Sequence, residues 1–136
     1  MKTIVRVSSV AVGLVLGLGL SGPASAEDPA NKALFTQYCG SCHGPDGTGN
    51  GVMSGFLKTK PADLTQIAKK NGGKFPMNET IQFIDGTKDV RAHGNPDMPV
   101  WGEVFKAQTK DSPRQQAEIR GKILMIADYV STIQAK

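Results

Sequence analysis

The sequence predicts an all-α fold in which helices at the two ends of the domain flank long irregular loops. Apolar residues recur at helical spacing near both ends, as with Leu34 and Tyr38, which are four residues apart. Glycine and proline interrupt the middle of the chain repeatedly, and no convincing strand pattern stands between them. The length of 136 residues suits one domain.

The first 26 residues have the pattern of a secretory signal peptide. Lys2 and Arg6 precede an uncharged apolar run over 7–20, and Ala24-Ser25-Ala26 is a small-x-small cleavage signature. The run is shorter than the ~20 apolar residues that a membrane-spanning helix needs. We therefore expect cleavage after Ala26, a periplasmic location, and no stable membrane insertion of the mature domain, residues 27–136.

The charge of the mature chain gives no reason to expect a nucleic-acid partner. Loss of Lys2 and Arg6 with the leader lowers the formal net charge from +4 to +2. The lysines that remain include a local basic excess at Lys58, Lys60, Lys69, Lys70 and Lys74. This excess either steers docking onto an acidic partner or is a solvated face.

The elements of the mature domain follow from capping residues and breakers. Asp28-Pro29 is a favourable helix start, so we predict a helix over 28–39. The glycine-rich segment 44–51 must be a loop, and 52–77 is a long loop with one helical turn at 62–70. Asn78 is expected to cap a short helix that ends at Gly86.

The remaining segments lead to the clearest helix of the chain. Residues 87–102 contain several glycines and prolines and predict a loop, followed by a short helix over 103–108. Ser112-Pro113 starts a long amphipathic helix that runs to about Gln134. Gly121 is expected to permit a close helix crossing within it.

Cys39-Gly40-Ser41-Cys42-His43 is a C-x-x-C-H run, the signature of covalent haem attachment. The two sulfurs form thioethers with the porphyrin vinyl groups, and His43 then binds the iron. Three other interpretations compete with haem c. A thioredoxin-like redox pair needs a βαβ pattern, which is not visible. A zinc site would have only His93 to complete it, because His43 is too close to the cysteines for the usual ligand spacing, and the third interpretation is a chance occurrence of the motif.

The second iron ligand is predicted to be Met98. It lies between Pro96 and Pro99, which restrict the backbone and can present the thioether rigidly. A His/Met pair is a known ligation of cytochromes c. Met77 is a weaker version of the same pattern, and His93 would give bis-histidine ligation instead.

The chain resembles the class I c-type cytochromes, small single-haem periplasmic electron carriers of bacteria. The resemblance rests on Cys39-Gly40-Ser41-Cys42-His43-Gly44, on Met98-Pro99-Val100-Trp101-Gly102, and on the terminal helix around Ala127-Asp128-Tyr129-Val130. It implies a cytochrome c fold in which the N- and C-terminal helices cross beside the haem. It also implies that a proline carbonyl accepts from Nδ1 of the iron-binding histidine, and Pro61 is the candidate.

The predicted function is that of a monomeric electron carrier without catalytic residues. It cycles Fe(III)/Fe(II) and contacts a donor and an acceptor redox protein transiently. Trp101 either donates its indole N–H to a haem propionate or covers the ring as a core aromatic. The alternatives are a haem enzyme or gas sensor with a displaceable sixth ligand, and a fixed cytochrome subunit of a dehydrogenase or oxidase.

Overall fold

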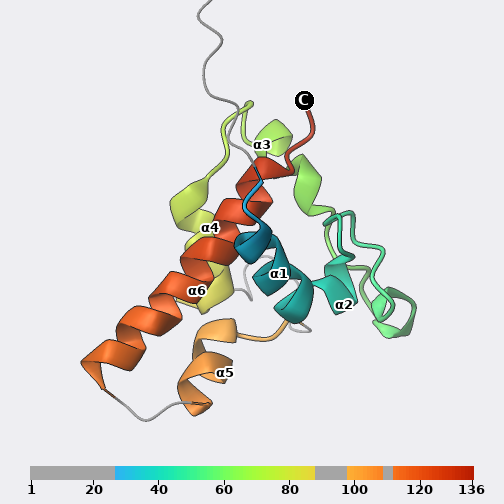
Figure 1. The fold of residues 1–136 in the computed structure, drawn as a ribbon. Helices are drawn as coiled ribbons and strands as arrows, with labels where there is room; N and C mark the ends of the chain where they lie inside the picture. Colours follow the sequence, from blue (N-terminus) through green and yellow to red (C-terminus); the bar gives the residue numbers. More distant parts are fainter. Residues whose placement is uncertain (1–26, 88–97, 109–111) are drawn as a thin grey trace, which may run out of the picture.

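The computed structural model describes residues 27–87, 98–108 and 112–136 (Figure 1). These residues form helices and no strand, so the prediction of an all-α fold is confirmed for them. The predicted leader, residues 1–26, and His93 lie outside the described residues. The elements in chain order are α1 (Pro29–Tyr38), α2 (Gly40–His43), the 3₁₀ turns η1 (Ser54–Phe56) and η2 (Leu64–Gln66), α3 (Ile67–Lys70), α4 (Met77–Asp85), α5 (Trp101–Ala107) and α6 (Pro113–Thr132).

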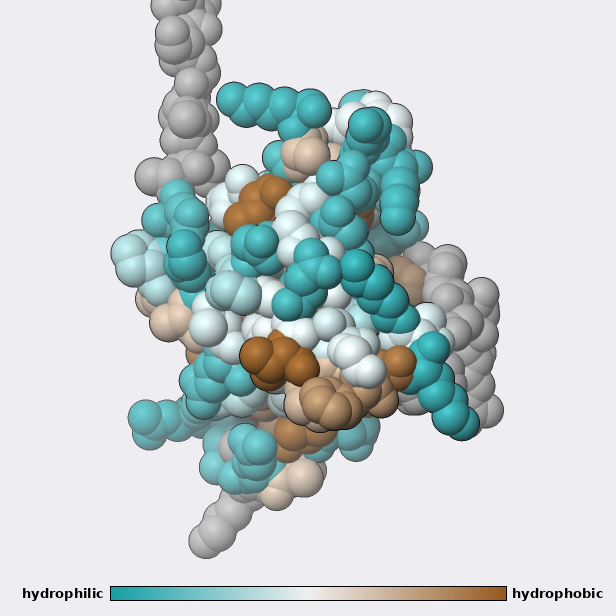
Figure 2. Space-filling model, turned by 90° about the vertical axis from the view of Figure 1, so that its right-hand side faces the viewer, coloured by the Kyte–Doolittle hydropathy of each residue, from teal (hydrophilic) through white to brown (hydrophobic). Residues whose placement is uncertain are grey.

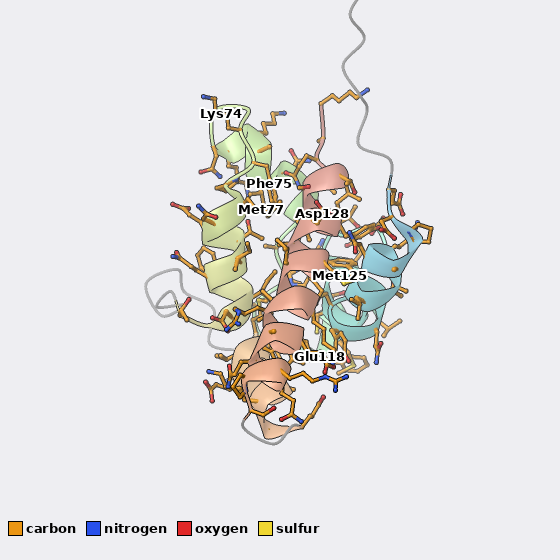
Figure 3. All side chains as sticks on the ribbon, turned by 60° about the vertical axis from the view of Figure 1, so that its left-hand side comes forward. Lys74, Phe75, Met77, Glu118, Met125 and Asp128 are labelled. Atoms are coloured by element: carbon orange, nitrogen blue, oxygen red, sulfur yellow. The ribbon has the colours of Figure 1, made fainter. Side chains whose placement is uncertain are left out.

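The first and last helices pack against each other (Figures 1 and 3). The Asp28 carboxylate accepts from the Ala30 amide at 2.8 Å and so caps α1 as predicted. The side chain of Phe35 is fully buried, and its ring centroid lies 4.8 Å from that of Tyr129 on α6. Phe35 and Tyr129 are therefore packing residues of the contact between α1 and α6.

A polar pair accompanies this apolar contact. The side-chain amide of Asn31 donates to the Asp128 carboxylate at 2.7 Å, and Figure 3 shows Asp128 on α6. Asn31 is buried, so the hydrogen bond satisfies a polar group that would otherwise be costly to remove from water.

Helix α6 supplies most of the core. Ser112 caps it as predicted, since its hydroxyl accepts from the Gln115 amide. Its apolar stripe is buried at Ile119, Ile123, Ile126, Ala127, Tyr129 and Val130. The expectation of a close crossing at Gly121 was wrong, because a Cβ there would meet nothing within 4 Å.

The middle of the chain is tied down by the C-terminus. The predicted turn at 62–70 is present as η2 followed by α3. The Gln134 side chain donates to the Leu64 carbonyl at 2.9 Å and accepts from the Ala68 amide at 2.8 Å. These hydrogen bonds explain how the 62–70 segment keeps its structure, although it has little apolar periodicity and no large core of its own.

The end of α4 and the start of α5 are in close contact. The prediction that Asn78 caps α4 was wrong, because α4 starts at Met77 directly after Pro76. Gly86 ends the helix as predicted, in the left-handed region at φ 78°. A Cβ on Gly86 would meet the Val100 side chain, and one on Gly102 would meet Asp85. Because Gly86 and Gly102 have no side chains, the segment that follows Met98 can pack directly against the end of α4.

The Phe35 packing gives a first prediction. Phe35→Ala is expected to lower the free energy of unfolding by ~3–5 kcal/mol, because it removes a fully buried ring and leaves a cavity. Denaturant titration of the purified mature protein measures the change. Leu124→Ala, at an exposed position on α6, is the control and should change it by less than ~0.5 kcal/mol. Equal losses in the two variants would contradict the assigned role of Phe35.

Candidate haem-attachment site

The three reactive side chains of the C-x-x-C-H run lie on one helical turn. The His43 amide donates to the Cys39 carbonyl at 2.9 Å, and the Cys42 amide donates to the same carbonyl at 3.2 Å. Residues three and four apart on a helix share a face. Cys39 and His43 are buried and Cys42 is half-buried, so this face of the turn is directed away from open solvent.

The glycine-rich loop that follows the turn donates hydrogen bonds to the unpaired backbone carbonyls of the turn. A helix end leaves carbonyls without intrahelical partners, and these need donors. Alternate amides of the loop supply them. The pairs are Gly49 N to His43 O at 2.8 Å, Gly51 N to Cys42 O at 3.0 Å, and Met53 N to Ser41 O at 2.9 Å.

The glycines are needed because the loop lies directly on the turn. A Cβ on Gly51 would meet the backbone of Ser41 and Cys42. Gly49 has φ +81°, and a Cβ there would meet the Pro61 carbonyl and the Ala62 backbone. Gly49 thus lies between the turn and the 61–62 segment. The signal for this arrangement is the alternation of glycine at 47, 49 and 51, which by itself predicts only a loop.

The second ring nitrogen of His43 is oriented by Ala62. Nδ1 of His43 lies 2.9 Å from the Ala62 carbonyl oxygen, which can only accept, so Nδ1 carries the proton. The prediction that Pro61 provides this carbonyl was wrong by one residue. Pro61 is buried beside Gly49, and its carbonyl faces that glycine instead of the imidazole.

Burial sets the protonation of the site. Desolvation lowers the pKa of His43, against the hydrogen bond to Ala62, which raises it. The neutral imidazole with Nδ1 protonated has its lone pair on Nε2, the form that binds a metal. Burial, together with the nearby Cys42, raises the pKa of Cys39 to about 12.

The raised Cys39 pKa bears on the thioredoxin-like interpretation. A C-x-x-C redox pair has a lowered thiol pKa, because the thiolate is its nucleophile. Desolvation at Cys39 acts in the opposite direction. A neutral sulfur, either a thiol or a thioether, is the form that this environment favours.

An aromatic cluster joins the turn to the segment that carries Met98. Tyr38, directly before Cys39, has its ring centroid 5.5 Å from that of Trp101 and 4.9 Å from that of Phe105. Trp101 is packed against the core, three residues after the half-buried Met98. Trp101 thus packs against aromatic residues, and Tyr38 is a packing residue of this cluster.

The other methionines occupy different surroundings. Met77, at the start of α4 in Figure 3, packs against the core, and Met53 is 44% exposed. Met125 is half-buried on α6. Within residues 27–87, 98–108 and 112–136, no three His, Cys, Asp or Glu side chains are grouped to hold a metal ion.

Two further findings do not concern the site itself. No helix in the described part of the chain is long and apolar enough to cross a membrane. Comparison of the chain with protein-family models, with curated proteins and with solved structures finds no match.

The packing of the loop gives a prediction for Gly49. Gly49→Ala forces a left-handed alanine against the Pro61 carbonyl and should destabilise the protein by ~1–3 kcal/mol. It should also speed solvent exchange of the His43 Nδ1 proton, since Ala62 must move. Thermal unfolding and proton NMR measure the two effects. The control is Gly55→Ala, where a Cβ meets nothing within 4 Å. The role of Gly49 is refuted if both variants behave alike.

Proposed function

We propose that this protein is a periplasmic single-haem electron carrier of the class I cytochrome c type. Cys39 and Cys42 hold haem c through two thioethers, and His43 and Met98 bind its iron. One observation carries the proposal: Cys39, Cys42 and His43 lie on one turn, with Nδ1 of His43 fixed on the Ala62 carbonyl. Haem c supplies one-electron Fe(III)/Fe(II) chemistry when it is bound.

The two cysteines fit covalent attachment. They are three residues apart on one turn, and both are free of disulfides. Burial penalises a charged thiolate at Cys39 and does not penalise a neutral thioether. The surroundings of Cys39 therefore suit an uncharged sulfur, as a thioether is.

His43 is prepared as an iron ligand by the backbone around it. The Ala62 carbonyl fixes the tautomer and the orientation of the ring, as hydrogen bonds to metal-binding histidines do. The backbone amide of Gly49 donates a hydrogen bond to the backbone carbonyl of His43 itself. The imidazole thus has little freedom to rotate away from a ligand.

Met98 is the proposed second ligand. Its segment is held by Val100 against Gly86 and by Gly102 against Asp85, and the Trp101 ring joins it to Tyr38 beside Cys39. A thioether ligand favours reduced iron, so the His43/Met98 pair suits an electron carrier. If His43 and Met98 both held the iron, no site on it would remain for a substrate, and the protein would need no catalytic base.

The proposed fold and the proposed redox partners follow from the same assignment as a cytochrome c. The packed helices α1 and α6 correspond to the terminal helices of the proposed cytochrome c fold. The mature chain, residues 27–136, is proposed to act as a monomer that contacts donor and acceptor proteins transiently. Small interfaces of this kind release quickly.

The optical spectrum tests the axial ligands. The purified oxidised protein should show a Soret band and a sulfur-to-iron charge-transfer band in the near red, and the reduced protein should not bind carbon monoxide. Met98→Ala should lose the near-red band and gain carbon monoxide binding while it keeps the Soret band. Met53→Ala, at an exposed methionine, is the control and should match the wild type.

Other spectral outcomes would contradict parts of the proposal. A protein without any Soret band holds no haem. Rapid carbon monoxide binding by the wild type would indicate an open iron and a haem enzyme or gas sensor. A wild type with neither the near-red band nor carbon monoxide binding would indicate His93 as the ligand.

The covalent attachment is tested separately. Acidified organic solvent should extract no haem from the wild type, because thioethers resist it, and should extract it from a variant with Cys39→Ala and Cys42→Ala. Absorbance of the organic phase measures the released haem. Ser41→Ala changes the turn without removing a sulfur and should retain all haem. Extraction of haem from the wild type would refute thioether attachment.

A further inference from the structure

The last residues of the chain are bonded to the segment formed by η2 and α3. Gln134 lies just after α6, and Figure 1 shows the C-terminus beside α3. The Gln134 side chain is half-buried, and its Oε1 accepts from the Ala68 amide at 2.8 Å. Its Nε2 donates to the carbonyls of Leu64 at 2.9 Å and Val130 at 2.7 Å. One side chain therefore bonds to both ends of the 64–68 segment and to α6.

The neighbours of Gln134 contact the same part of the molecule. The Ala135 amide donates to the Thr65 carbonyl at 2.8 Å. A Cβ on Gly47 would meet the Ile133 side chain, so Ile133 lies against the glycine-rich loop. The three consecutive residues 133–135, which we call the C-terminal clamp, thus contact both the loop and the segment that follows it.

The C-terminal clamp acts two residues away from the carbonyl that orients His43. Leu64 is bonded on both sides of its backbone, because its carbonyl accepts from Gln134 and its amide donates to the Gly47 carbonyl at 2.8 Å. The Ala62 carbonyl oxygen, two residues earlier, is 2.9 Å from Nδ1 of His43. Over so short a stretch of chain, a displacement of Leu64 displaces the Ala62 carbonyl.

The segment depends on contacts from outside it. The turn η2 has three residues and α3 has four, and helices this short are not stable on their own. Asp63 caps η2 by accepting from the Thr65 amide at 3.0 Å, but this bond lies within the segment and does not position it. Figure 2 views the side of the molecule that carries the loops after α2, and hydrophilic residues cover much of it. Hydrogen bonds are therefore an important means of positioning this part of the chain.

We propose that Gln134 is a positioning residue for the iron ligand His43. By bonding to Leu64, it keeps the Ala62 carbonyl on Nδ1 of the imidazole. This rests on the function proposed above. A hydrogen bond from Nδ1 makes the imidazole a more basic ligand, and a more basic ligand stabilises Fe(III) more than Fe(II). Loss of the Gln134 contacts weakens this hydrogen bond and so raises the reduction potential of the iron.

Gln134→Met is the test variant, because it keeps the length of the side chain and removes all three hydrogen bonds. Solvent exchange of the His43 Nδ1 proton should become about tenfold faster, since the bond to Ala62 weakens. The midpoint potential of the iron should rise. Proton NMR of the reduced protein measures the exchange, and a redox titration measures the potential.

Thr132→Val is the matched control. The Thr132 hydroxyl donates to the Tyr129 carbonyl at 2.7 Å, so its bond lies within α6 itself. The substitution removes a hydrogen bond from the same end of the helix and none from the 64–68 segment. Both variants should lose stability in a denaturant titration, and only Gln134→Met should change the exchange rate and the potential. Equal changes in the two variants, or none in Gln134→Met, would overturn the proposal.

A second variant isolates the contact with Leu64. At pH 8, Gln134→Glu keeps an acceptor for the Ala68 amide and replaces the Nε2 donor by a carboxylate oxygen, which cannot donate. It should speed the exchange of the His43 proton as Gln134→Met does, because Leu64 is the contact that leads to Ala62. An exchange rate equal to that of the wild type would refute this route.

The outcome is separable from that of the proposed function. The Soret band reports whether the protein holds haem, and the exchange of the His43 proton is measurable with haem or without it. Faster exchange in Gln134→Met, in a protein that shows no Soret band, would support the positioning role and refute the electron carrier. Unchanged exchange in a protein that does show the band would refute the positioning role and leave the carrier standing.

Discussion

The geometry of the site depends on three backbone carbonyls at the end of one short helix. Helix α2 has four residues, too few to be stable alone, and its last carbonyls have no helical partners. The amides of Gly49, Gly51 and Met53 bond to them. Because a buried unpaired carbonyl is costly, these bonds hold the turn in its shape, and the shape holds Cys39, Cys42 and His43 on one face.

The same constraint determines the path of the loop after the turn. The loop can approach the turn closely enough to donate only where glycine leaves room, as at Gly51. Gly49 then leaves room on its other side for the 61–62 segment, which brings the Ala62 carbonyl to the imidazole. The orientation of His43 therefore follows from backbone packing: the loop packs on the turn, and the 61–62 segment packs on the loop. The imidazole is the one side chain that takes part in this arrangement.

Local signals in the sequence predicted the parts of the fold that depend on near neighbours. Asp28 and Ser112 cap their helices because each side chain reaches an amide two or three residues ahead. The apolar stripe of α6 is equally local. These signals, with the spacing of Cys39, Cys42 and His43, were sufficient to predict the terminal helices and the candidate site.

Features that depend on distant contacts could not be predicted in this way. Every residue has a carbonyl, so nothing in the sequence distinguishes Ala62 from Pro61 as the partner of His43. Glycine is a residue typical of close helix crossings, yet α1 packs on α6 through Asn31 and Phe35, and Gly121 takes no part in a close crossing. Which face of α6 meets α1 is decided by the whole core.

Tyr129 shows how that core and the site depend on each other. Its ring lies against Phe35 in the contact between α1 and α6, and its hydroxyl donates to the Pro45 carbonyl at 3.0 Å. Burial raises the pKa of Tyr129, so the hydroxyl stays protonated and remains a donor. Pro45 begins the loop whose amides hold the turn. The packing of the terminal helices thus positions the loop, and the loop in turn positions the residues proposed to bind haem.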